Sequence, residues 1–432
     1  IGNAQELLWF AGVVNGTLTD VPKDTLSCAE LTADIDLSSV CGEEIGSWNP
    51  IGFSGNSYSG TFDGKGYGIK NLYATGTSTL VGLGLFGNIK SATISDLSML
   101  SGSIISSGSN IGSIAGTVYM STITNCHNYI PISGGRFAGG VVGYASKSSI
   151  VKCHNEVNIK SYSNNGCGGI CGCNYGSEVS YCYNVADIVC EAGRVGGIVG
   201  SLEFYGIIHH CFSIGSVTGS AQGGIYGYAE TGISSESKDN YFNSTTGRES
   251  TFTRFKKMDA FANGEVCYLL NAGSEVPVFF QSIGVDKYPV LNGNEVVVKD
   301  EDKYYNVSLS ICEHGDSTYV APTCASCGIT YCTKCHKLFD TVPALGHDTT
   351  IIVTKPTCTK IGYSTAQCSV CGSKLYNCDT VPALGHDTTI VETKPTCTKI
   401  GYSTAQCSVC GSKLYNCDTV PAISHDTTIV ET

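Results

Sequence analysis

A repeat of 27–29 residues, running from about residue 83 to residue 243, is the feature that most constrains the fold. Its first marker is an apolar pair flanked by glycines, found at 112–116, 139–143, 168–172, 196–200 and 223–227. A second marker follows about ten residues later and centres on Cys126, Cys153, Cys182 and Cys211. Short β-prone runs between Gly, Ser and Asn turns at this period predict one solenoid coil per repeat, and so much glycine disfavours helix. We therefore expect an all-β solenoid of about six to eight coils.

Stacked coils place equivalent residues above one another, about 4.8 Å apart. The four cysteines then form a column, preceded by Leu97 and followed by Tyr241. These end residues favour a column of small buried side chains. Disulfides between stacked neighbours and a metal ladder that includes nearby histidines are the alternatives. A second predicted column is a ladder of side-chain amides, bonded from coil to coil, at Asn128, Asn155, Asn184, Ser213 and Asn243.

One outward-facing stripe of rings recurs at the coil period. It consists of His127, His154, Tyr183, Phe212 and Phe242. Ring stacking that stabilises the coils is the interpretation we favour for this stripe, and a surface on which a ligand could bind is the alternative. The adjacent pair His209–His210 is expected to face opposite sides of a strand, which would not form a catalytic dyad.

The C-terminal region contains a nearly exact duplication. Residues 348–386 and 387–425 carry almost the same 39 residues, each with the spacing C-x9-C-x2-C-x6-C. The cysteines of the two copies are Cys358, Cys368, Cys371 and Cys378, then Cys397, Cys407, Cys410 and Cys417. A histidine stands at each boundary, at His347, His386 and His425. The pattern predicts small Cys-rich β modules in tandem.

A module of this size has too little core to fold unaided, so its cysteines are predicted to be structural. We favour disulfides, with zinc as the alternative and free thiols as the third possibility; four cysteines allow three pairings. In the irregular module that precedes the two copies, the best metal candidate is the set Cys324, Cys327, Cys332 and Cys335. Apart from zinc in these modules, no cofactor is expected.

The predicted organisation has seven segments. The best helical candidate is 252–258 with 259–271, which would cap the solenoid, because a β-helix end otherwise presents unpaired strand edges. The segments are an N-terminal cap with opening coils (1–82), the β-helix coils (83–246), a C-terminal cap (247–300), the irregular Cys-rich module (301–347), the two repeats (348–386 and 387–425) and the start of a further repeat (426–432).

Composition limits the partners and the compartment. The net charge is −12 with no Lys/Arg run, which argues against nucleic acid as a partner. No apolar run reaches the ~18–20 residues of a membrane-spanning helix. The 24 cysteines favour an extracytoplasmic compartment or metal sites. A start at Ile1 instead of Met is expected for a mature secreted protein or a fragment.

The glycine-apolar-glycine repeats resemble the GLUG motif of bacterial surface proteins and adhesins. The opening run, with Trp48–Gly52 and Gly60–Gly66, and the closing segments 263–271 and 284–291 are similar to those of such solenoids, so that the resemblance covers about residues 1–295. It implies a right-handed parallel β-helix on an exported bacterial protein. The Cys-rich modules resemble repeats appended to surface proteins of anaerobic gut bacteria.

The sequence does not favour an enzyme. Parallel β-helices include polysaccharide lyases and hydrolases, but those reactions need clustered charged groups, and the charges between residues 83 and 237 do not recur at the coil period. We therefore expect a secreted or cell-surface protein that adheres through a β-helix head on a Cys-stapled stalk. Its partners would be glycans or proteins of a host or neighbouring cell. The alternative is a structural subunit of an extracellular filament whose partners are copies of itself, with 426–432 as a pairing strand, and a polysaccharide-acting enzyme ranks third.

Overall fold

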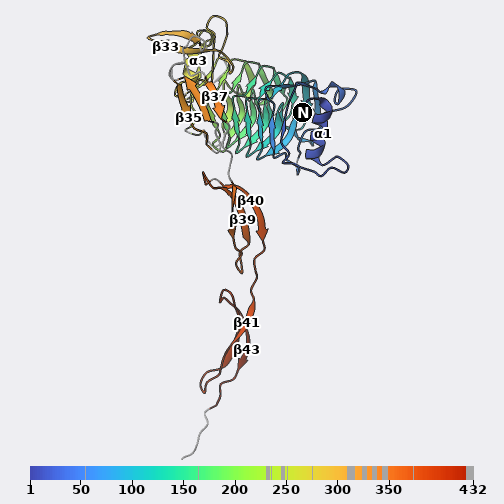
Figure 1. Ribbon diagram of the computed structural model, residues 1–432, viewed down its shortest axis with the longest axis vertical. Coiled ribbons are helices and arrows are strands. Elements are labelled where there is room, and N and C mark those ends of the chain that lie inside the picture. Colours follow the sequence, from blue (N-terminus) through green and yellow to red (C-terminus); the bar gives the residue numbers. More distant parts are fainter. Residues whose placement is uncertain are drawn as a thin grey trace, which may run out of the picture. The chain divides into compact units, whose positions relative to one another are not determined.

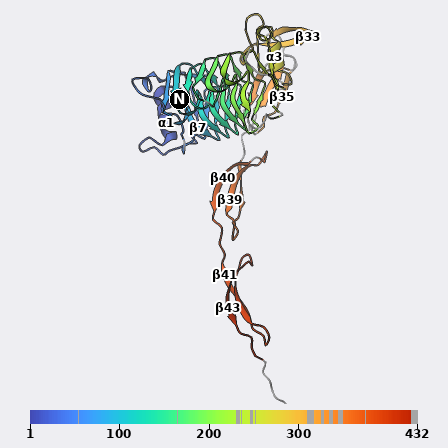
Figure 2. The same cartoon turned by 180° about the vertical axis from the view of Figure 1, so that it is seen from behind.

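Four parallel sheets make up most of the first of two units, Ile1–Glu313 and His314–Thr432 (Figure 1). The computed structural model describes residues 1–432 except 54, 164, 230–233, 235, 245–248, 251, 275, 309–316, 324–327, 333–337, 343–348, 373 and 425–432. The coils stack into a parallel β-solenoid of about seven turns, which confirms the predicted fold class. Figure 2 shows the same stack from behind.

The first sheet has seven strands: β1 (Ala29–Glu30), β3 (Thr61–Asp63), β8 (Thr93–Ser95), β13 (Thr122–Thr124), β18 (Ser149–Val151), β23 (Glu178–Ser180) and β27 (Ile207–His209). The second has nine: β2 (Ile35–Asp36), β4 (Gly68–Lys70), β9 (Ser98–Met99), β14 (His127–Asn128), β19 (His154–Asn155), β24 (Tyr183–Asn184), β28 (Phe212–Ser213), β31 (Asn240–Phe242) and β32 (Thr253–Phe255).

The third sheet has six strands: β7 (Phe86–Lys90), β12 (Ala115–Tyr119), β17 (Val142–Ser146), β22 (Cys171–Tyr175), β26 (Val199–Glu203) and β30 (Tyr226–Ala229). The fourth has ten: β5 (Leu72–Gly76), β10 (Gly102–Ser106), β15 (Ile132–Gly134), β20 (Ile159–Ser161), β25 (Ile188–Gly196), β21 (Gly166–Gly168), β16 (Ala138–Gly139), β11 (Ser109–Gly112) and β6 (Val81–Leu83), with β29 (Val217–Gly223) on β25.

Aliphatic columns form the core of the stack. Ile123 pairs with Ile150, which pairs with Val179, which pairs with Ile208, and all four are buried. The register advances by one coil at each step, as the 27–29-residue period predicts. Identical positions therefore bury the same kind of side chain, because strand side chains alternate between the two faces of a sheet.

Helix α1 (Ala4–Asn15) lies at the N-terminal end of the stack and was not predicted (Figure 1). The Asn3 side chain accepts from the backbone N–H of Glu6, and the Glu6 carboxylate accepts from the N–H of Gly2. Leu7, Phe10 and Val14 are buried in the solenoid core, where the Phe10 ring lies 5.8 Å from that of Tyr58. The helix covers the first coil. Its capping pattern, Asn3-x-x-Glu6, can be read in the sequence and would have indicated where the helix begins.

The predicted helix at 252–271 is only partly right. Its first part is strand β32, which pairs in parallel with β31 and extends the nine-stranded sheet. The helical parts are α2 (Met258–Ala262) and α3 (Glu265–Leu270). They pack against the outer face of that sheet, because Phe261 lies 5.7 Å, ring to ring, from Phe212.

The remaining elements are small antiparallel sheets and a single turn of 3-10 helix. A hairpin of β33 (Glu295–Asp300) and β34 (Lys303–Ser308) ends the first unit, and the turn, η1 (Leu37–Ser39), lies near its start. The second unit has three sheets: β35 (Ser317–Val320), β36 (Gly328–Cys332) and β37 (Leu338–Val342); β38 (Thr349–Thr354), β39 (Gly362–Cys368) and β40 (Lys374–Val381); β41 (Thr388–Thr393), β42 (Gly401–Cys407) and β43 (Lys413–Val420). In the described part of the chain no helix has the length and apolarity needed to cross a bilayer.

Candidate functional site

The cysteine column points into the core, as predicted. Cys126, Cys153, Cys182 and Cys211 are fully buried and free. Burial raises the pKa of the Cys126 and Cys182 thiols, so these groups stay neutral. The predicted end of the column was wrong by one residue: Asn240, not Tyr241, follows Cys211, because Phe212 pairs with Tyr241.

The amide ladder is present over four coils. Asn128 donates to Asn155 at 2.7 Å, Asn155 donates to Asn184 at 2.7 Å, and Asn184 donates to the Ser213 hydroxyl at 3.2 Å. The predicted last rung was wrong, because Phe242 and not Asn243 pairs with Ser213. Amide pairs that are buried and fully bonded stabilise the turn and fix the register.

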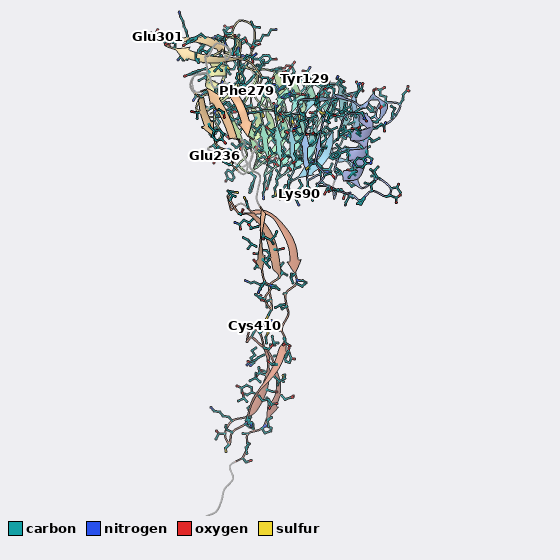
Figure 3. All side chains as sticks on the ribbon, viewed as in Figure 1. Lys90, Tyr129, Glu236, Phe279, Glu301 and Cys410 are labelled. Atoms are coloured by element: carbon teal, nitrogen blue, oxygen red, sulfur yellow. The ribbon has the colours of Figure 1, made fainter. Side chains whose placement is uncertain are left out.

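The stripe of rings, whose alternative interpretation was a ligand surface, is not exposed. His127, His154, Tyr183 and Phe212 are buried, and successive rings stack with centroids 4.1–5.1 Å apart. Residues of the C-terminal cap cover the stripe: the Phe279 ring lies 5.7 Å and the Tyr288 ring 6.3 Å from Phe212. Figure 3 labels Phe279 and Tyr129 on this side of the solenoid.

The last member of the predicted stripe is also out of register. Phe242 is buried beside Ser213, and Tyr241 takes the place after Phe212. The contacts support the favoured interpretation, in which the stacked rings stabilise the coils. The outward-facing rings could not by themselves reveal the segment that covers them, which begins about 50 residues further along the chain (261 − 212 = 49).

Burial shapes the electrostatics of the stacked histidines. Desolvation lowers the pKa of His127, and desolvation together with His127 lowers the pKa of His154 to about 2. The Tyr129 hydroxyl lies 2.9 Å from His154 Nε2, and the Glu156 carboxylate lies 3.6 Å from the same atom. Both imidazoles are therefore neutral at physiological pH and act as packing groups.

The adjacent histidines do not face opposite sides. His209 Nδ1 lies 2.9 Å from His210 Nδ1, because His210 adopts a left-handed conformation (φ 52°) that turns its ring toward the preceding one. His209 Nε2 lies 3.1 Å from the Glu178 carboxylate, which lowers the pKa of that carboxyl. The three groups line a hollow of about 430 Å³, together with Tyr181 and Lys238. The arrangement can hold a small polar group or pass a proton between the rings.

An exposed aromatic corner joins the third sheet to the first. The turn residues Met120, Lys147, Gly176 and Phe204 all adopt left-handed φ angles of 49–59°. Phe204 is 51% exposed and the extra turn residue Tyr205 is 62% exposed. We call Tyr144, Tyr175, Phe204 and Tyr205 the aromatic corner.

Rings of the aromatic corner stack along the coil direction. The Phe204 ring lies 5.0 Å from the Tyr175 ring with 4° between their planes, and the Tyr175 ring lies 6.4 Å from Tyr144. We did not predict this surface. The sequence feature that could have predicted this surface is the aromatic pair at 204–205. It lies in a turn where the two preceding coils have Lys147 and Gly176.

The predicted structural cysteines are described in part. Cys324, Cys327 and Cys335 lie outside the described residues, as does the 426–432 strand, and Cys332 and Cys378 are described by their backbone alone, in β36 and β40. Of the predicted structural cysteines whose side chains are described, Cys358, Cys368 and Cys407 are buried, Cys371, Cys397 and Cys410 are exposed and Cys417 is half-buried, and Cys358, Cys397, Cys407, Cys410 and Cys417 are free thiols. The disulfide framework stays a prediction.

One cluster joins the two copies of the repeat. Cys358 from the first copy, the boundary residue His386, and Cys407 and Cys410 from the second copy place one ligand atom each within 4.8 Å of one another. The sulfur atoms of Cys358 and Cys407 are 3.6 Å apart, and Cys410 Sγ lies 3.5 Å from His386 Nδ1. Figure 3 labels Cys410. We had grouped the cysteines within each copy, and nothing in their spacing reveals that they meet across copies.

The four groups of the cluster have pKa values shifted in different directions, and desolvation with the neighbouring Cys407 raises the pKa of Cys358 to about 11. The backbone amide of Cys410 and the His386 ring lower the pKa of Cys407 to about 6. The Ser412 hydroxyl lowers the pKa of Cys410, and hydrogen bonding to Cys407 raises the pKa of His386. Thiolates are the form of cysteine that binds metals, and the lowered pKa values favour this form at Cys407 and Cys410.

The comparison with known families gives one match. The family model described as the GLUG motif matches residues 191–218, which include the marker Gly196–Gly200, Cys211 and Phe212. No curated protein matches the chain. Together with the coil geometry, the match identifies the chain as a parallel β-helix protein that carries the GLUG motif.

Proposed function

We propose that the chain is a non-enzymatic protein of the bacterial cell surface or extracellular space that adheres through its β-helix. The observation that carries the proposal is the aromatic corner, where Phe204 and Tyr205 expose about half or more of their surface. Exposed clusters of large apolar side chains mark interaction sites on soluble proteins. Left-handed backbone at bulky side chains is uncommon, and both residues adopt it (φ 52° and 57°).

The chemistry of the corner fits two kinds of partner. Flat rings with exposed edges and a tyrosine hydroxyl suit glycans or apolar protein surfaces, because tyrosine combines an apolar body with a polar tip. The GLUG motif, found in bacterial surface proteins, supports an extracellular location. The net charge of −12 disfavours nucleic acid.

The filament alternative is less well supported. Stacking of coils between copies requires open strand edges at both ends of the solenoid. Helix α1 covers the first coil through Leu7, Phe10 and Val14, which removes one of those ends. Adhesion needs no such end and is the function we favour.

Binding of the full chain to arrays of glycans and extracellular-matrix proteins tests the proposal. We expect the double substitution Phe204→Ala and Tyr205→Ala to reduce binding at least tenfold, since each buried aromatic contributes about 1 kcal/mol or more to an interface. The matched control is Tyr162→Ala, which removes a ring of similar exposure (55%) beside the fourth sheet. Equal binding by the parent and the double variant would reject the aromatic corner as the adhesive surface.

A further inference from the structure

The cluster of Cys358, His386, Cys407 and Cys410 brings four soft ligands together at the junction between the two copies. We propose that these residues bind one zinc ion, which joins the first copy of the repeat to the second. Three thiolates and one imidazole are a usual ligand set for a structural zinc site. The proposal concerns the construction of the Cys-rich region and does not depend on adhesion.

Two of the six separations between the ligand atoms match those of a tetrahedral ion, and all four atoms lie within 4.8 Å of one another. With Zn–S bonds of ~2.3 Å and Zn–N bonds of ~2.0 Å, tetrahedral geometry separates two sulfur ligands by about 3.8 Å and a sulfur from a nitrogen by about 3.5 Å. The two observed separations are 3.6 Å for Cys358 Sγ to Cys407 Sγ and 3.5 Å for Cys410 Sγ to His386 Nδ1. A disulfide bond would require ~2.05 Å between the sulfur atoms.

The turn between Cys407 and Cys410 is shaped for a metal. Gly411 adopts φ 71° and its N–H donates to the Cys407 carbonyl at 2.9 Å, which closes the turn after the second cysteine. Cys407 N–H donates to the Ser412 carbonyl at 2.9 Å, and Cys410 Sγ lies 3.2 Å from the Ser412 hydroxyl, so hydrogen bonds hold both cysteines of the turn in place.

Backbone hydrogen bonds bring Cys358 to the junction. Gly385 N–H donates to the Cys358 carbonyl at 3.1 Å, and Leu384 N–H donates to the Thr357 carbonyl at 2.9 Å. Leu384 and Gly385 directly precede His386 in the sequence, so these two bonds place Cys358 beside the His386 ligand. On the other side Ser408 N–H donates to the Asp387 carbonyl at 2.9 Å, which holds His386 next to the Cys407–Cys410 turn.

The modules need such a link because their own cores are small. Ile351, Ile352 and Val353 of β38 are about half exposed or more. An isolated three-stranded sheet of this kind is marginally stable in water. A metal that binds only the folded arrangement adds its binding free energy to the stability of both copies.

Site-resolved thiol protection tests the proposal on the full chain. Zinc-bound cysteines resist alkylation, and the tryptic peptide 338–360 contains Cys358 as its only cysteine. With zinc supplied, Cys358 should be protected in the parent, and addition of a zinc chelator should expose it. The double substitution Cys407→Ser and Cys410→Ser should also expose it, although those residues belong to the other copy.

Zinc content and a matched control complete the experiment. The double variant and His386→Ala should each bind one zinc fewer per chain than the parent, whereas Cys417→Ser, outside the cluster, should not change the zinc content. With cobalt in place of zinc, His386→Cys should increase the thiolate-to-metal charge-transfer absorption by adding a fourth sulfur ligand.

Three results would overturn the proposal. The first is an unchanged zinc content in the double variant. The second is a Cys358 that stays protected in that variant, which would place its metal within one copy. The third is a disulfide at Cys358 or Cys407 in the folded, non-reduced protein.

Discussion

The two glycines that start four of the five repeat markers, at 139–140, 168–169, 196–197 and 223–224, are packing residues. A Cβ on Gly140 would lie 2.8 Å from the Asn155 side chain, and a Cβ on Gly169 would lie 2.5 Å from that of Asn184. The second glycine of the marker therefore makes the space that the amide ladder fills. A glycine of the first marker and an asparagine of the second, fifteen positions apart at Gly140 and Asn155, therefore form one packing unit.

We expect Gly169→Ala to destabilise the solenoid by about 1–3 kcal/mol, the usual cost of overpacking a core. The added methyl group would lie 2.2 Å from the Gly197 carbonyl oxygen, and that backbone cannot move without breaking the ladder. The urea midpoint of unfolding measures the effect. Gly42→Ala is the control, because a Cβ at Gly42 meets nothing within 4 Å. Equal midpoints for the two variants would refute the packing role.

The buried histidines should make stability depend on pH. The folded-state pKa of His154 lies near 2, below the ordinary value of about 6.5, so the unfolded chain binds more protons than the folded one. The stabilising effect is complete above pH 6.5 and declines as the pH falls, by up to about 1.4 kcal/mol per pH unit for each such histidine.

The substitution His154→Tyr isolates this effect, because Tyr183 already occupies the same position in the next coil. Between pH 7 and pH 5 the free energy of unfolding of the parent should fall by about 1–2 kcal/mol more than that of the variant. Carboxylates titrate in both proteins and cancel in the comparison. Identical pH profiles would show that the His154 imidazole is accessible to protons in the folded state.

At the scale of elements, the strands of the coils could be predicted from the sequence, but the segments that pack over them could not. The period locates residues such as Cys126 and Asn128 because strand alternation fixes which of them face inward. The last coil was misplaced by one residue, since nothing in the sequence fixes how many residues the turn before Asn240 contains. The covering of the ring stack by α2, α3 and Phe279 arises from tertiary packing that local patterns do not encode.

Helix α1 is the element whose removal should matter most. We expect Phe10→Ala to reduce the free energy of unfolding by about 3–5 kcal/mol, because it leaves a cavity beside Tyr58 and Phe62. Trp9→Ala, which removes a 56% exposed ring from the same helix, should change it by about 0.5 kcal/mol or less. Chemical denaturation followed by circular dichroism gives both values. Similar losses in the two variants would mean that α1 does not cover the coil end as described.

At the scale of the whole molecule, the two repeat systems differ in what holds them together. The solenoid coils share a continuous apolar core, whereas the C-terminal copies meet through polar and cysteine groups at their junction. The sequence predicted both arrays, because both periods are regular. The aromatic corner and the junction cluster could not be predicted, since each depends on residues from different repeats that only the fold brings together.

Electron microscopy of the negatively stained full chain, at high concentration and with zinc present, tests the account most directly. Because α1 covers one end of the coil stack, the account predicts separate particles that each contain a single solenoid. Long, regular filaments built by end-to-end contact of solenoids would contradict the account. They would show that the protein is a filament subunit and not an adhesin.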